Sequence, residues 1–180
     1  MRKEIFQEIE IPKEIEAEIV GNLISIKGNE GEIKNKFNIN KITLEKKDSK
    51  IVIGNKKATK NEKKMINTIA AHVRNMIKGV QNKFEYKLKI CSSHFPMSVE
   101  IKENEAIIKN FLGEKIPRKS KILEGVKVEI DGDIITATSH NKELVGQTAA
   151  NFEKATRIRS RDRRIFQDGI FIINKAGKEI

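Results

Sequence analysis

The chain has 180 residues and a formal net charge of +11, with 36 Lys and Arg against 25 Asp and Glu, and 38% of its residues are hydrophobic. This length allows one medium domain or two small ones. The longest clear apolar run, Ile170–Ile173, is far shorter than the roughly 20 residues of a membrane span, and the single cysteine excludes both a disulfide framework and a thiolate zinc cluster. Residues 1–10 lack the pattern of a signal or transit peptide, so we expect a cytoplasmic protein without a membrane partner.

Turn signals and hydrophobic periods predict several strands and one helix in the first half of the chain. Gly21-Asn22 and Asp48-Ser49 each separate two strand-like runs, as the turns of β-hairpins do. Thr59 and Glu62 have the spacing of a capping box. Apolar residues at three-and-four spacing follow and predict a helix. They are Ile66, Ile69, Ala70, Val73, Ile77 and Val80.

The next segment, Phe84–Ile90, alternates apolar and charged residues, which predicts a strand with one buried face. We expect this strand to close the first sheet. Ser92-Ser93 and Pro96 then interrupt the strand pattern. The predicted domains are therefore residues 1–91 and residues 92–180.

The second half repeats this scheme. Short strands are predicted at residues 99–102, 106–109, 126–130 and 134–138, with Asp131-Gly132 as a tight turn. Ser139 or Asn141 is suited to cap a second helix. Its inward stripe is predicted to be Val145, Thr148, Ala149, Phe152 and Ala155.

The two halves also match one another in sequence. Ala17–Glu32 aligns with Val99–Glu114 at an offset of 82, and Ala70–Val73 aligns with Ala149–Phe152 at an offset of 79. Strands followed by a helix in each half argue against alternating βαβ units. We therefore predict an α+β fold of two tandem duplicated domains, each an antiparallel β-sheet packed against one α-helix.

Candidates for catalysis are few. The three histidines, His72, His94 and His140, lack metal-ligand spacing. Asp131 and Asp133, with His140, would be the residues of a metal-dependent phosphodiesterase, but Asp-Gly-Asp between two apolar runs is also what a hairpin turn uses. We predict no catalytic residue, no metal site and no cofactor.

The positive charge instead favours a polyanionic partner, and nucleic acid is the leading class. Five of the eight arginines, Arg157, Arg159, Arg161, Arg163 and Arg164, lie within eight consecutive residues. On an extended chain, the four at odd positions would share one side, spaced about 6.6 Å apart at about 3.3 Å per residue. Guanidinium groups in such a row suit a run of phosphates.

The alternative interpretation of this segment is a solvated charged loop. Lys154 adds to its positive charge and Asp162 is its single acidic residue, so self-repulsion favours an anionic ligand over that alternative. Most of the eight phenylalanines fall in strand or helix periods and are predicted to be core residues. Because no exposed aromatic platform for bases is evident, we expect recognition of folded RNA or a duplex through backbone and shape.

Four motifs give the chain a family resemblance. It resembles the archaeal and eukaryotic branch of the large-subunit ribosomal protein six family in its tail, Arg163–Ile172, and in the second helix, Val145–Asn151. His94-Phe95-Pro96 and Ala71–Val80 agree more weakly. One departure from the tail signature is Phe171, where the family usually has tyrosine.

The resemblance implies a structural constituent of the large ribosomal subunit that binds large-subunit rRNA, mainly through the C-terminal domain. It implies a position near the sarcin-ricin loop and the translation-factor-binding region at the stalk base. The implied partners are rRNA, neighbouring large-subunit ribosomal proteins and, nearby, translation factors. The alternative is a non-ribosomal nucleic-acid-binding module that acts as an RNA chaperone or regulator.

Carried onto this chain, the resemblance identifies contact residues and supporting residues. The supporting residues are Phe166, Asp168 and Gly169. The implied rRNA contacts are Lys154, Arg157, Arg159, Arg161, Arg163, Arg164, Lys175 and Lys178, with Gln147 and Asn151 as second-tier candidates.

Overall fold

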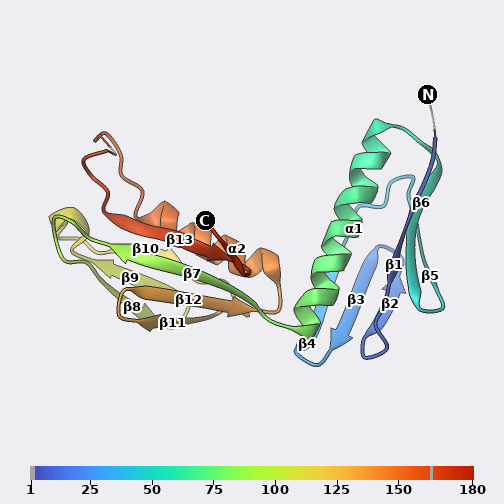
Figure 1. Ribbon diagram of the computed structural model, residues 1–180, viewed down its shortest axis with the longest axis horizontal. Coiled ribbons are helices and arrows are strands. Elements are labelled where there is room, and N and C mark those ends of the chain that lie inside the picture. Colours follow the sequence, from blue (N-terminus) through green and yellow to red (C-terminus); the bar gives the residue numbers. More distant parts are fainter. Residues whose placement is uncertain (1–2, 163) are drawn as a thin grey trace. The chain divides into compact units, whose positions relative to one another are not determined.

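The computed structural model describes residues 3–162 and 164–180 and divides the chain into two compact units (Figure 1). The first unit ends at Lys83, and the second runs from Phe84 to Ile180. Each unit combines antiparallel sheets with one long helix, so the predicted α+β class and the tandem arrangement are confirmed.

The predicted domain boundary between residues 91 and 92 is corrected to one between Lys83 and Phe84. The cause is the strand β7 (Phe84–Cys91), which shows the expected alternation of buried and exposed residues. Instead of closing the first sheet, it lies between β12 (Ile134–Ser139) and β13 (Gly169–Lys175) in the second unit. Alternation shows that a strand has one buried face, but it does not say which strands are its neighbours.

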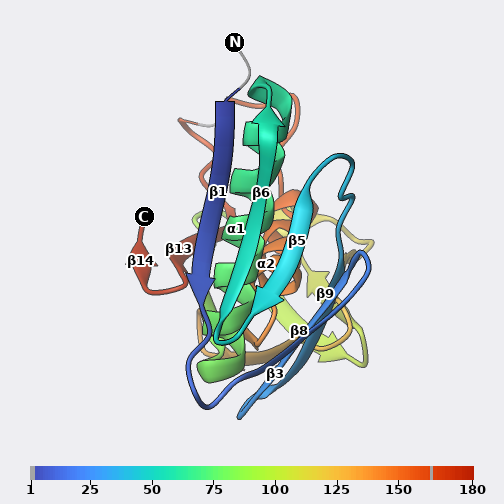
Figure 2. The same ribbon diagram turned by 90° about the vertical axis from the view of Figure 1, so that its right-hand side faces the viewer.

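The first unit contains two three-stranded sheets where a single sheet was predicted. One has the order β1-β6-β5 and the other β2-β3-β4, and all pairings are antiparallel. Figure 2 shows β1, β6 and β5 side by side with the helix α1 behind them. The strands and helix are β1 (Lys3–Glu10), β2 (Glu16–Val20), β3 (Leu23–Gly28), β4 (Gly31–Lys36), β5 (Thr43–Lys47), β6 (Lys50–Ala58) and α1 (Lys60–Gln81).

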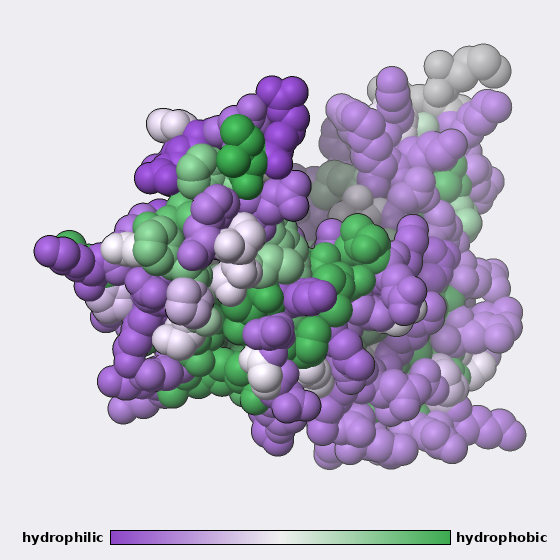
Figure 3. Space-filling model, turned by 60° about the vertical axis from the view of Figure 1, so that its left-hand side comes forward, coloured by the Kyte–Doolittle hydropathy of each residue, from purple (hydrophilic) through white to green (hydrophobic). Residues whose placement is uncertain are grey.

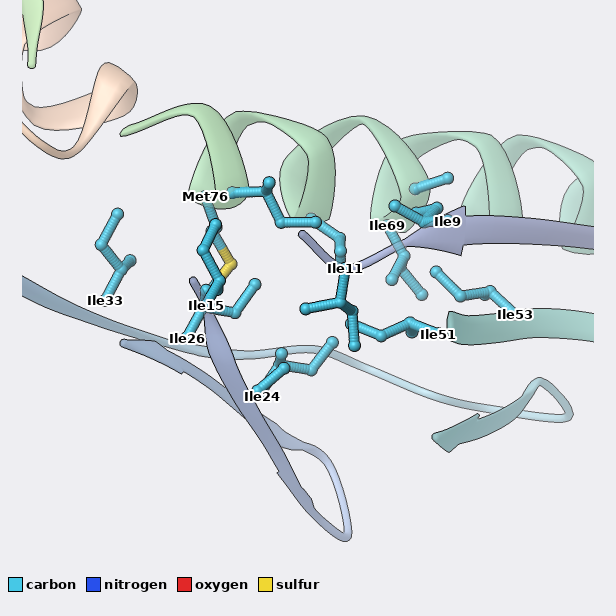
Figure 4. Packing of buried hydrophobic residues seen from close by; sticks show 14 of the residues in the cluster. Ile9, Ile11, Ile15, Ile24, Ile26, Ile33, Ile51, Ile53, Ile69 and Met76 are labelled. Atoms are coloured by element: carbon cyan, nitrogen blue, oxygen red, sulfur yellow. The ribbon is translucent and has the colours of Figure 1, made fainter. Parts of the chain in front are cut away.

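The helix α1 begins as its sequence predicts. The backbone N–H of Thr59 donates to the Glu62 carboxylate (2.8 Å), as in a capping box. Its apolar stripe is buried against isoleucines of both sheets, and Figure 4 shows these side chains gathered under the helix together with Met76. Each fully buried isoleucine contributes about 1.5–3 kcal/mol to folding, so this cluster is the main source of stability in a unit without a disulfide.

The second unit also contains two antiparallel sheets. One has the order β10-β9-β8 and the other β11-β12-β7-β13-β14. The elements not yet named are β8 (Ser98–Lys102), β9 (Glu105–Lys109), the short 3₁₀ helix η1 (Phe111–Gly113), β10 (Arg118–Lys121), β11 (Lys127–Asp131), α2 (Lys142–Ala155) and β14 (Lys178–Glu179).

The duplication predicted from the sequence is visible in the topology. The order β1-β6-β5 of the first unit recurs as β7-β12-β11 in the second, and β2-β3-β4 recurs as β8-β9-β10. The strands β8 and β9 begin 82 residues after β2 and β3, which is the offset of the sequence alignment. The second unit adds β13 and β14, and β13 pairs with the edge of β7 that β12 leaves open.

The prediction that most phenylalanines are core residues is wrong. Only Phe111 and Phe152 are buried, whereas Phe6, Phe95 and Phe171 are exposed. One of these three exposed rings, that of Phe171, lies on the strand β13. The buried stripe of α2, by contrast, is as predicted. At Gly146 this helix lies so close to Tyr86 that an added Cβ would be 3.4 Å from the Tyr86 hydroxyl oxygen.

Candidate nucleic-acid interface

The basic segment forms a loop between α2 and β13, and its two ends are fastened together. Thr156, at the C-terminal end of α2, is buried, and its hydroxyl donates to the carbonyl of Phe152 (3.2 Å). The same hydroxyl accepts from the backbone N–H of Ile170 at the start of β13 (2.9 Å). The loop therefore projects from a closed base, visible at the upper left of Figure 1.

A second fastening holds the C-terminal end of the loop to the turn that follows β7. The Asp168 carboxylate is 3% exposed and accepts from the backbone N–H of Ser93 (2.7 Å) and of His94 (3.0 Å). It also accepts from the Ser93 hydroxyl (3.1 Å) and from Nδ1 of the His94 ring (2.6 Å). Four donors thus converge on one carboxylate, which fixes its position and fixes the tautomer of the ring.

These contacts decide the charge state of Asp168. Burial alone raises the pKa of a carboxyl. The hydrogen bonds from the backbone and ring of His94, joined by those from Ser93, outweigh burial and lower the pKa of Asp168 to about 2. The carboxylate is therefore ionised at neutral pH.

Phe166 links this fastening to an arginine of the loop. Its ring stacks on the His94 ring, with centroids 4.8 Å apart and planes 20° apart. The guanidinium of Arg161 lies 4.7 Å from the centre of the Phe166 ring, a cation–π contact. This contact restrains the Arg161 side chain, which is nevertheless exposed to solvent.

Among its described residues the loop contains no helix, but the prediction of an evenly extended row of arginines is wrong. Ser160 has a φ of +58° and turns the chain, and the carbonyl of Asp162 accepts from the backbone N–H of Phe166 (2.9 Å). Arg164 bends back to the Asp162 carboxylate (2.9 Å), and this bond lowers the pKa of Asp162. Arg157 and Arg159 are exposed, and Arg163 lies outside the described residues.

An arginine that the sequence analysis missed lies beneath the loop. Arg118 donates to both carboxylate oxygens of Glu114 (2.8 and 2.6 Å) and to the carbonyl of Ala155 at the end of α2 (2.8 Å). Its guanidinium also lies 4.2 Å from the centre of the Phe111 ring. The hydrogen bonds from Arg118 lower the pKa of Glu114 and outweigh the smaller, opposite effect of burial. This carboxylate is therefore ionised, and the charge of Arg118 balances it. The four-residue spacing of Glu114 and Arg118 was the available signal.

The loop, η1 and β10 together enclose a basic hollow of about 460 Å³. Within residues 3–162 and 164–180, Lys154, Arg157 and Arg159 form no ion pair. The only carboxylate of the lining is Glu114, which Arg118 already neutralises. The basic hollow is lined by Phe111, Leu112, Glu114, Arg118, Lys119, Lys154, Ala155, Arg157, Ile158, Arg159 and Arg161.

Five of the described candidates from the sequence do not line the basic hollow: Arg164, which is paired with Asp162, and the four residues described next. Lys175 and Lys178 are cross-strand partners at the far end of β13, about 20 Å from the loop at about 3.3 Å per residue. On α2, the amide of Gln147 donates to Asn151 (2.9 Å), and the amide of Asn151 donates to the carbonyl of Lys121 (2.9 Å). Asn151 thus joins α2 to β10.

The structure also bears on the expectations for metal binding and for membrane-spanning helices. In the described ranges, no group of three or more His, Cys, Asp and Glu side chains is arranged to hold a metal ion, and this includes Asp131, Asp133 and His140. Neither α1 nor any other described helix combines the length and apolar character needed to cross a membrane.

The sequence was also compared with known proteins. The model of the family described as Ribosomal protein L6 matches residues 11–83 and 95–169, one segment in each unit. The chain is 46% identical over 174 residues to the large ribosomal subunit protein uL6 of Methanococcus vannielii, covering 97% of this chain and 96% of the relative. It is 44% identical over 171 residues to the protein of that name from Methanobrevibacter smithii, covering 95% and 96% respectively.

Proposed function

Because the chain belongs to the ribosomal protein L6 family, we propose that it is a structural component of the large ribosomal subunit that binds large-subunit rRNA chiefly through its second unit. The observation that carries the proposal is the basic hollow, where cationic side chains from α2, the loop and β10 gather around one neutralised carboxylate. Such a concentration of charge raises the folding cost unless a polyanion is present. The sugar-phosphate chain of a folded RNA supplies that polyanion.

Phosphate neutralisation provides most of the affinity in this proposal. Arg157, Arg159 and Arg161 each offer a planar fork of N–H donors to phosphate oxygens, and Lys154 adds a point charge. Because both ends of the loop are held by hydrogen bonds, fewer backbone conformations have to be lost on binding, which reduces its entropic cost. Recognition then depends on the shape of the RNA and on where its phosphates lie.

The finer location follows from the family resemblance. We place the second unit near the sarcin-ricin loop at the stalk base, with neighbouring ribosomal proteins around it and translation factors nearby. The role is structural, not catalytic, and the site of action is the ribosome in the cytoplasm. Lys175 and Lys178, at the far end of β13, are proposed as separate phosphate contacts, and Gln147 contributes to the RNA-facing surface of α2 beside Asn151.

Sedimentation through a sucrose gradient tests the proposal. The protein is expected to migrate with large subunits after a wash in high salt. A free pool without subunit association would contradict the proposal and favour the non-ribosomal nucleic-acid-binding module. Crosslinking of the protein to RNA within intact subunits then identifies the rRNA segment, and crosslinks far from the sarcin-ricin loop would refute the finer location.

A further inference from the structure

A second hollow lies beside the basic hollow and differs from it in chemistry. Its volume is about 970 Å³, and most of its lining is apolar. The lining includes Phe171, Phe166, Ala150 and Ile158. We call it the aromatic hollow. Figure 3 shows one face of the molecule coloured by hydropathy, in which hydrophobic residues lie among hydrophilic ones below a largely hydrophilic projection.

Of the two aromatic rings in this lining, that of Phe171 is the more exposed. It is 40% exposed, and among the described residues it has no stacking or cation–π partner, whereas Phe166 has both. The neighbouring Gly169 allows this placement: its φ is +152°, and a Cβ there would lie 3.1 Å from the tip of the Phe171 ring. Ligand-binding pockets are lined mainly by apolar and aromatic side chains with a few polar groups, and the lining of this hollow has that composition.

The two hollows are adjacent, since Lys154, Arg157 and Ile158 line both. A nucleic acid has the matching alternation, because each anionic phosphate is followed by a flat base with apolar faces. When a phosphate lies at Lys154 and Arg157, its own base is within reach of the aromatic hollow. We infer that the aromatic hollow receives one unpaired nucleobase of the rRNA, which stacks on Phe171.

The polar residues at the rim of the aromatic hollow are better suited to bind a neutral base than to bind a second phosphate. Glu153 contributes a carboxylate there, one oxygen of which accepts from the backbone N–H of Ile172 (3.0 Å). A carboxylate repels phosphate but accepts hydrogen bonds from the amino groups of bases. Gln167, which is exposed, adds an amide that can both donate and accept. An apolar side chain of a protein would leave Lys154 and Arg157 without a counter-charge.

This inference rests on the proposed function, and a photocrosslink distinguishes the failure of each. Phe171→p-benzoylphenylalanine is made in the full chain, large subunits are isolated and irradiated, and the crosslinked partner is mapped. The expected partner is one unpaired nucleotide of rRNA. Phe6→p-benzoylphenylalanine is the matched control, because Phe6 is 41% exposed but lies in the first unit, so it is expected to miss that nucleotide.

The outcomes separate as follows. A Phe171 crosslink to a ribosomal protein, or only to paired nucleotides, overturns the inference and leaves rRNA binding by the second unit intact. Absence of the protein from large subunits overturns the proposed function itself.

A binding measurement with conservative rescue completes the test. Full-length Phe171→Ala is expected to rebind large subunits depleted of the protein about 5- to 150-fold more weakly, the range of one base–aromatic stack. Phe171→Tyr keeps the ring and is expected to bind as the wild type does. Because the cations are unchanged, the salt dependence of binding should be the same in all three proteins. Equal affinity of Phe171→Ala and wild type would overturn the inference.

Discussion

The hydroxyl of Thr156 accepts a hydrogen bond from the backbone N–H of Ile170, which joins the end of α2 to the start of β13 across the whole basic loop. Both residues are buried, at 3% and 0% exposure. The two ends of the loop therefore lie next to one another, and its cationic side chains project from a fixed base.

Removal of this bond should destabilise the second unit. Thr156→Val leaves the buried N–H of Ile170 without an acceptor, so we expect its free energy of unfolding to fall by about 1–3 kcal/mol. Urea unfolding followed by the fluorescence of Tyr86, the only tyrosine, reports on this unit. Thr156→Ser keeps the hydroxyl and should lose no more than about 1 kcal/mol. A loss in Thr156→Val no larger than the loss in Thr156→Ser would contradict a stabilising role for the bond, because valine keeps the methyl group and replaces only the hydroxyl.

Asp168 should make the stability of the second unit depend on acid. Because its pKa is lower in the folded state than the ordinary value of 3.8, its contribution is present above about pH 4 and is lost as the pH falls toward 2. The difference in pKa corresponds to about 2 kcal/mol. In Asp168→Asn, unfolding should already be easier at neutral pH, and the acid dependence between pH 4 and 2 should be weaker.

Urea unfolding at several pH values measures this effect. Asp133→Asn, in the exposed turn before β12, is the matched control, and it should retain the acid dependence of the wild type. A variant Asp168→Asn with the wild-type pH profile would show that the Asp168 carboxylate contributes no linked stability.

The exposed arginines of the loop should set the salt dependence of RNA binding. Each phosphate neutralised contributes about 0.7–0.9 to the slope of log affinity against log salt. Arg159→Ala with Arg161→Ala should therefore reduce the magnitude of the slope by about 1.4–1.8, measured by titration of large-subunit rRNA. Lys56→Ala with Lys57→Ala removes the same charge from exposed positions of the first unit. A similar reduction in that control would mean that net charge, and not the loop, governs binding.

Arg118 should be needed as a guanidinium and not merely as a positive charge. Arg118→Lys keeps the charge but cannot bond both oxygens of Glu114 and the Ala155 carbonyl together. We expect the second unit to lose about 1–2 kcal/mol of stability in urea unfolding. The exposed Arg74 in α1, changed to Lys, should cost less than about 0.5 kcal/mol. Indistinguishable stabilities of the two variants would contradict the role given to Arg118.

Features encoded locally were predictable from the sequence. The capping box at Thr59, the hairpin turns at Gly21-Asn22 and Asp131-Gly132 and the stripe of α2 depend on residues a few positions apart, and all are confirmed. The location of β7 was not predictable in this way, because its partners β12 and β13 are more than 40 residues away along the chain. Pairing over such distances depends on the whole fold.

The same contrast between features encoded by nearby residues and features that depend on distant residues applies to the candidate site. The cluster of arginines was evident because its members are close in sequence, but its shape depends on Ser160, whose φ of +58° no pattern indicated. The partners of Asp168 lie 74 and 75 residues away, at His94 and Ser93. That the ring of Phe171 is exposed was not predictable, since alternation along β13 does not reveal which face stays open.

The strand β13 has a larger consequence than its length suggests. In the first unit the chain leaves α1 and passes directly into β7, and among the described strands none pairs with the outer edge of β1. In the second unit the chain must travel from α2 back to the corresponding edge, and the connection it makes is the basic loop. The basic loop therefore exists because β13 occupies the edge of β7, and the first unit, which has no strand at the corresponding edge among its described residues, has no such loop.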